Sequence, residues 1–122
     1  MSDPLKTLHL DLDGAWPADA LGEQAGYLDA RVWGPRLRYC APGRQIEAFF
    51  RDMAPRLKPF VLTGSGDFHH LTALFLRKVR DPFVLVSFDN HPDWDVRPPR
   101  WSCGGWINRA LELPALEKAA VW

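Results

Sequence analysis

The sequence has few cysteines, no excess of one charge and no long apolar run. Its two cysteines, Cys40 and Cys103, are too few for a disulfide framework, so we expect a reduced, cytoplasmic chain. The 15 Lys and Arg residues balance the 15 Asp and Glu residues, which argues against a nucleic-acid partner because phosphate neutralisation needs a basic excess. Apolar runs fall short of the ~20 residues that a membrane-spanning helix needs, so no membrane partner is expected.

The 122 residues are enough for one domain, residues 1–122, with a sizeable core. The spacing of apolar residues predicts alternating strands and helices. The expected strands cover residues 5–12, 60–63, 83–88 and 119–122, and the expected helices cover residues 44–57, 71–80 and 106–113. Residues 14–43 are rich in Gly, Pro, Ala and Asp and are expected to be mostly loop, with a short helix near 19–24 and a short strand near 37–40.

This order of elements predicts an α/β fold. Strands that are apolar throughout, separated by amphipathic helices, are typical of a parallel sheet covered on both faces. Such sheets bind ligands just beyond the carboxyl ends of their strands. Residues that carry chemistry are therefore expected at the ends of the predicted strands.

The strongest signal follows the expected strand 83–88. Asp89, His91 and Asp93 alternate there, and alternate residues of an extended chain point to the same side. Two carboxylates and an imidazole suit Mn²⁺, Zn²⁺ or Fe²⁺ better than a soft metal. The alternative interpretation is a turn cluster in which the Asp and Asn side chains bond loop amides.

Two further strand ends carry weaker signals. Adjacent His69 and His70 follow a glycine loop at residues 64–66; they suit a metal ligand with a supporting neighbour, or one packed and one solvated histidine. Asp11 and Asp13 follow the first strand, in a pattern shared by metal sites, aspartyl phosphotransfer sites and plain turns.

Two of these segments together resemble the arginase family of ureohydrolases. Gly66-Asp67-Phe68-His69 resembles its Gly-Gly-Asp-His motif with one residue inserted, and Asp89-Asn90-His91-Pro92-Asp93 is similar to its Asp-Ala-His-x-Asp motif. The resemblance spans roughly residues 60–113. It implies a three-layer αβα fold with a mainly parallel sheet and a manganese centre, holding two ions when complete. Asp89 would bridge both metals, Asp93 and His69 would bind one, and His91 the other.

The implied activity is metal-dependent hydrolysis of a C–N bond in a small amidine, guanidino or amide substrate. Asp93 would stand at the reacting centre, and Cys103 lies roughly where the family has a His-Gly pair. The resemblance also implies a later Asp-x-Asp motif that completes the centre. Asp11 and Asp13 are the sole candidates for it in this chain. We interpret the chain as the N-terminal part of a longer domain, so the fold formed by these residues would be incomplete.

Two other hypotheses fit parts of the sequence. In a haloacid-dehalogenase-like phosphatase, Asp11 would be the nucleophile and Asp13 the acid/base, with Asp89 and Asp93 binding magnesium. In a non-catalytic protein, an exposed strand edge and apolar face would drive self-association into a homo-oligomer.

Overall fold

The structure is a computed structural model that describes residues 6–122. Its strands are β1 Thr7–Asp11, β2 Gly26–Asp29, β3 Cys40–Ala41, β4 Phe60–Leu62, β5 Phe83–Ser87, β6 Trp101–Ser102 and β7 Leu116–Val121. Its α-helices are α1 Gly34–Leu37, α2 Gly43–Met53, α3 Thr72–Phe75 and α4 Trp106–Ala110. Its 3₁₀ segments include η2 Ala54–Arg56, η3 Gly66–Leu71 and η4 Leu76–Lys78.

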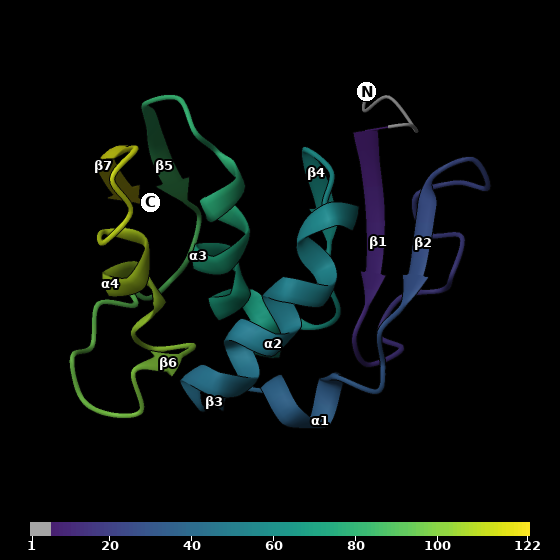
Figure 1. The fold of residues 1–122 in the computed structure, drawn as a ribbon, viewed down its shortest axis with the longest axis horizontal. Coiled ribbons are helices and arrows are strands. Elements are labelled where there is room, and N and C mark those ends of the chain that lie inside the picture. The colour runs from purple at the N-terminus through teal and green to yellow at the C-terminus, as the bar shows by residue number, and fades with distance from the viewer. Residues whose placement is uncertain (1–5) are drawn as a thin grey trace.

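The strands form two parallel sheets and one short antiparallel pair. Strand β1 lies in the middle of the sheet β2-β1-β4, β5 pairs with β7 in parallel, and β3 pairs with β6 in antiparallel. From left to right, Figure 1 shows the parallel strands in the order β7, β5, β4, β1 and β2. The expected α/β character and parallel pairing are thus confirmed. Within residues 6–122, however, β4 and β5 are not hydrogen-bonded to each other, so the parallel strands form separate sheets.

The regular elements follow from burial. All five residues of β1 are buried, the polar Thr7, His9 and Asp11 as well as the two leucines, because β1 is the central strand of its sheet. In α2 one face is buried through Ile46, Phe49 and Met53, at the three- and four-residue spacing of an amphipathic helix. Pro55 lacks an N–H group, and the chain beyond Met53 continues as the 3₁₀ segment η2 rather than as α-helix.

One hydrophobic core joins the helices to both parallel sheets. Its buried members are Leu8, Leu10, Leu12, Ala30, Leu37, Ala41, Ile46, Phe49, Met53, Phe68, Leu71, Ala73, Leu74, Leu85, Trp101, Trp106, Ile107 and Ala110. The core therefore includes residues on either side of the gap between β4 and β5, and packing rather than strand pairing holds the two sheets together.

Several expected elements differ in the structure. Residues 19–24 form turns rather than a helix, and the expected strand near 37–40 is replaced by the end of α1 and the start of β3. Pro35 in the first turn of α1 favours helix there, and Tyr39 then reverses the chain with a positive φ of 63°. Strand β2 was not expected. The helices at 71–80 and 106–113 are shorter than predicted, and Leu5 of the first expected strand lies outside the described residues.

The expectation that both faces of the sheet are covered is not met for β5. Leu85 points into the core, but Val84, Val86 and Phe88 are exposed, as is Trp122 just beyond β7. Within residues 6–122 these residues are left at least half exposed. No helix in the same range is long and apolar enough to cross a membrane.

Candidate metal centre

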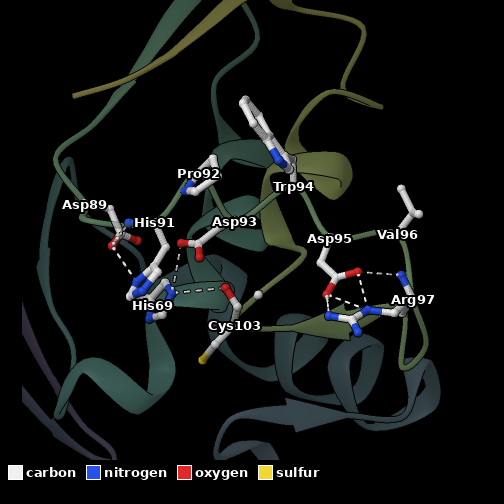
Figure 2. A pocket seen from close by; sticks show the side chains of 11 residues that line it. His69, Asp89, His91, Pro92, Asp93, Trp94, Asp95, Val96, Arg97 and Cys103 are labelled. Carbon is white, nitrogen blue, oxygen red and sulfur yellow. Dashed lines mark hydrogen bonds and ion pairs between the residues drawn. The ribbon is translucent and has the colours of Figure 1, made fainter.

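Two turns that follow different strands bring three potential metal ligands together. His69 lies in η3 after β4, whereas Asp89 and Asp93 lie in the loop after β5. One ligand atom from each of the three lies within 4.8 Å of the others. Figure 2 shows their side chains on one side of a pocket, with the Asp95–Arg97 ion pair on the other side.

Asp89 is fixed at the start of the loop. Its backbone N–H donates to the carbonyl of Trp122 (3.1 Å), which extends the β5–β7 pairing by one residue. Its Oδ1 accepts a hydrogen bond from the backbone N–H of His91 (3.0 Å), which closes a local turn. This turn leaves the His91 side chain 82% exposed, with Nδ1 3.8 Å from Asp89 Oδ1. His91 therefore lies at the rim of the three-residue cluster rather than within it.

Asp93 has a left-handed backbone, with a φ of 53°. This conformation is uncommon for a non-glycine residue, although Asp tolerates it better than most. The carboxylate is buried, and its Oδ2 accepts a hydrogen bond from Trp106 Nε1 (2.8 Å). Burial raises the pKa of Asp93, and a hydrogen bond shared with Asp89 raises it further while lowering the pKa of Asp89. The two carboxyl groups are thus crowded enough to favour a shared proton or a cation.

His69 is held by oxygen atoms at both ring nitrogens. Nδ1 lies 2.5 Å from the carbonyl oxygen of Gly66, and Nε2 lies 3.2 Å from both Asp93 Oδ2 and the carbonyl oxygen of Cys103. Contacts with Cys103, Gly66 and Asp93 raise the pKa of His69 to about 10 against the opposing effect of burial. Without a cation, His69 is therefore an imidazolium that donates from both nitrogens.

The cluster opens into a pocket of about 680 Å³. Its lining combines the cluster with exposed aromatic, charged and apolar side chains. The lining residues are His69, Asp89, His91, Pro92, Asp93, Trp94, Asp95, Val96, Arg97, Cys103 and Gly104. A small molecule that enters this pocket meets the cluster directly.

The three residues fit a single divalent cation. The Gly66 carbonyl can keep the proton of His69 on Nδ1, which leaves Nε2 free as a ligand, the usual arrangement for metal-bound histidine. Bonds from zinc to N and O ligands are about 2.0–2.2 Å long, so ligand atoms on one ion lie at most about 4.4 Å apart. The observed spacing within 4.8 Å thus requires only a small inward movement of the side chains. Three protein ligands leave positions open for water and substrate.

Within residues 6–122, His70 and Cys103 lie outside the three-residue cluster, His70 in the core and Cys103 in the lining of the pocket. His70 is fully buried, and its Nδ1 lies 3.3 Å from Cys103 Sγ. Burial lowers the pKa of His70 to about 4, so this ring is neutral at pH 7. The Cys103 thiol also donates to the carbonyl of Asp67 (3.3 Å), and Figure 2 shows its sulfur pointing away from Asp93. His70 is thus a core residue because consecutive residues of a 3₁₀ helix face different sides.

Asp11 and Asp13 do not join the three-residue cluster found in residues 6–122. Asp11 is buried, and it accepts hydrogen bonds from the Tyr27 hydroxyl (2.6 Å) and the Gly14 N–H (2.8 Å). Asp13 accepts one from the backbone N–H of Ser65 (3.2 Å) and forms an ion pair with Arg38 (3.3 Å). Both carboxylates stabilise the turns at the end of β1, which is the simple turn role that their spacing also allowed.

Trp106 and Gly66 make contacts that the sequence analysis did not assign, although Gly66 belongs to the Gly66-Asp67-Phe68-His69 segment. These contacts use an indole N–H and a backbone carbonyl, and no sequence motif marks either group as part of a metal site. The one available signal was the position of Trp106 directly after Cys103-Gly104-Gly105, near the implied centre.

Comparison with known proteins adds one relative. A segment of 59 residues, 48% of this chain, is 48% identical to an uncharacterized protein of Thermotoga maritima. The match covers 24% of that protein, so about three quarters of the relative lies outside it. No protein-family profile and no solved structure matches the chain.

Proposed function

We propose that His69, Asp89 and Asp93 bind a manganese-type divalent cation and that the chain is an arginase-like hydrolase of C–N bonds. The observation that carries the proposal is the convergence of three ligand atoms, from turns after β4 and β5, within 4.8 Å at the wall of a pocket. In this proposal the two parallel sheets belong to a three-layer αβα architecture. The substrate is a small amidine, guanidino or amide compound.

Each residue has a role in this proposal. His69 binds through Nε2 while the Gly66 carbonyl orients its ring, and Asp89 and Asp93 supply the negative charge. This mixed nitrogen and oxygen donor set suits Mn²⁺, with Zn²⁺ and Fe²⁺ as alternatives. When bound, the cation supplies Lewis-acid polarisation of the substrate and a water of lowered pKa. The exposed His91 at the rim is placed to accept or donate a proton in the pocket.

The phosphatase hypothesis has less support. A nucleophilic Asp11 must reach a substrate phosphorus atom. Asp11 is instead buried, and its two oxygens bond Tyr27 and Gly14. The pocket that holds the carboxylate cluster is lined by His69 of η3, by residues of the loop after β5, and by Cys103 and Gly104, and Asp11 is not part of that lining.

Titration calorimetry with Mn²⁺ tests the cation site. The wild-type chain is expected to bind one equivalent, and Asp89→Asn to bind at least about tenfold more weakly, because it removes a charged ligand. Asp95→Asn is the matched control: Asp95 lies in the same loop and lines the same pocket, but its carboxylate bonds Arg97. Absence of binding to the wild type, or equal losses in the two variants, would contradict the site.

A second assay tests the reaction class. The Mn²⁺-loaded wild type is incubated with a panel of guanidino, amidine and amide compounds, and released urea, ammonia or amine is measured. We expect turnover of a compound in this panel and its loss in Asp89→Asn. A chain that binds Mn²⁺ but hydrolyses none of the panel would retain the cation site and contradict the hydrolase.

A further inference from the structure

The first turn of α4 holds the loop that carries Asp93. Trp106 Nε1 donates to Asp93 Oδ2 (2.8 Å), and the backbone N–H of Ile107 donates to the Asp93 carbonyl (3.1 Å). Asn108 Nδ2 donates to the carbonyls of Trp94 (2.9 Å) and Asp95 (3.1 Å). Three consecutive residues of one helix turn thus bond three consecutive residues of the loop.

The approach between these segments is close. A Cβ atom added to Gly105, which precedes α4, would lie 2.5 Å from the Asp95 carbonyl oxygen. Glycine is required there so that the loop can lie against the start of the helix. The left-handed turn at Asp93 is therefore held against a rigid element.

Trp106 differs from the other residues of this contact because its side chain contacts two of the three cluster residues, Asp93 and His69. Its side chain is only 3% exposed, and besides the bond to Asp93 its ring packs edge-to-face against the His69 imidazole. The ring centroids are 6.4 Å apart with an interplanar angle of 84°. Asp93 and His69 come from turns 24 residues apart in sequence, and one indole fixes both.

We infer that Trp106 is a positioning residue that orients Asp93 and His69 for the cation before it binds. This inference rests on the proposed cation site. The indole N–H restricts rotation of the Asp93 carboxylate, and the indole ring blocks rotation of the imidazole away from it. Groups that orient metal ligands by hydrogen bonds usually change metal affinity by about 10–100-fold when mutated.

Trp106→Phe tests this role, because phenylalanine keeps an aromatic ring but lacks the hydrogen-bond donor and is smaller than the indole. We expect its Kd for Mn²⁺ to rise at least about tenfold. Trp101→Phe is the matched control: Trp101 is also buried, but its ring lies beneath the Arg77 guanidinium rather than against the cluster. Its Kd for Mn²⁺ should stay within about twofold of the wild type, and thermal unfolding of both variants shows whether each is folded.

A spectroscopic readout on the wild type decides the question even if Trp106→Phe does not fold. In ¹⁵N–¹H spectra the assigned Trp106 indole resonance should shift on addition of Zn²⁺, a diamagnetic probe, while the Trp101 resonance stays in place. A wild type that binds neither ion contradicts the proposed function itself. A wild type that binds Mn²⁺, with unchanged affinity in folded Trp106→Phe or a Zn²⁺-insensitive Trp106 resonance, overturns the positioning role alone.

Discussion

The neighbouring residues His69 and His70 have very different pKa values because their local contacts differ. His69 faces the pocket, where a hydrogen bond with the Cys103 side chain, followed by contacts with Gly66 and Asp93, raises its pKa to about 10, whereas burial lowers the pKa of His70 to about 4. At pH 7 one ring is therefore charged and the other neutral. A cation at His69 must displace its proton, as metal binding to histidine generally does.

The buried His70 predicts acid sensitivity of the fold. Its pKa of about 4 lies below the unfolded value of 6.5, so the unfolded chain takes up the proton first as pH falls. The stabilisation is complete above pH 6.5 and is lost between pH 6.5 and about 4, by up to ~3 kcal/mol. Urea unfolding at several pH values should show this slope, and His70→Gln should flatten it. A slope that survives in His70→Gln would assign it to another group.

The candidate site could be predicted from sequence only in part. The alternation of Asp89, His91 and Asp93 assumes an extended chain, and on that basis all three would point one way. The structure brings Asp89 and Asp93 together but leaves His91 at the rim, because Asp89 bonds the His91 N–H and Asp93 adopts a positive φ. The choice between His69 and His70 was also beyond the sequence, since it depends on which side of η3 meets the core.

At the scale of elements, the junction between β1 and α1 depends on a glycine. A Cβ atom on Gly34 would overlap the carbonyl oxygen of Leu12, just past the end of β1. Gly34 therefore lets α1 begin directly beside the turn that carries Asp13. Arg38, the residue after α1, then reaches the Asp13 carboxylate.

Gly34→Ala should consequently destabilise the protein by about 1–3 kcal/mol, the usual cost of forcing extra atoms into a packed site. Gly43→Ala is the matched control, since Gly43 begins α2 and a Cβ atom there meets nothing within 4 Å. That variant should gain up to about 1 kcal/mol, because alanine loses less conformational freedom on folding. Chemical denaturation measures both, and a Gly34→Ala variant as stable as the wild type would show that α1 can shift freely.

The elements that could be predicted are those whose own residues carry the pattern. Strand β1, helix α2 and strand β5 have apolar residues at strand or helix spacing, and all three are confirmed near their expected bounds. Strand β2 has no such pattern, because Gly26–Asp29 is mostly exposed and forms a strand through parallel pairing with β1. Its Tyr27 hydroxyl bonds Asp11 across that pair, a contact invisible in local sequence.

At the scale of the whole molecule, the β5–β7 sheet has an uncovered apolar strip. We define this strip by Val84, Val86, Phe88 and Trp122, all of them exposed. Parallel sheets are normally covered on both faces, and exposed apolar patches drive association. The strip is the feature that supports the self-association hypothesis.

We expect light scattering to show association that increases with protein concentration and weakens in Val86→Lys. A lysine at the centre of the strip places a charge where a second copy would pack. Val32→Lys is the control, because Val32 is an exposed valine outside the strip. A wild type that stays monomeric at high concentration, or equal effects of the two substitutions, would contradict self-association through this strip.

Because the two parallel sheets are not paired with each other, the proposed cation would also affect how firmly they pack together. His69 follows β4 in one sheet, and Asp89 and Asp93 follow β5 in the other, and in the described part of the chain no backbone hydrogen bonds pair β4 with β5. An ion bound by all three residues would reversibly link the β2-β1-β4 sheet to the β5-β7 sheet. Its removal by a chelator should loosen the β5–β7 half first, seen as faster amide hydrogen exchange there than in β1. In the proposal, the bound cation would therefore also stabilise the packing between the two sheets.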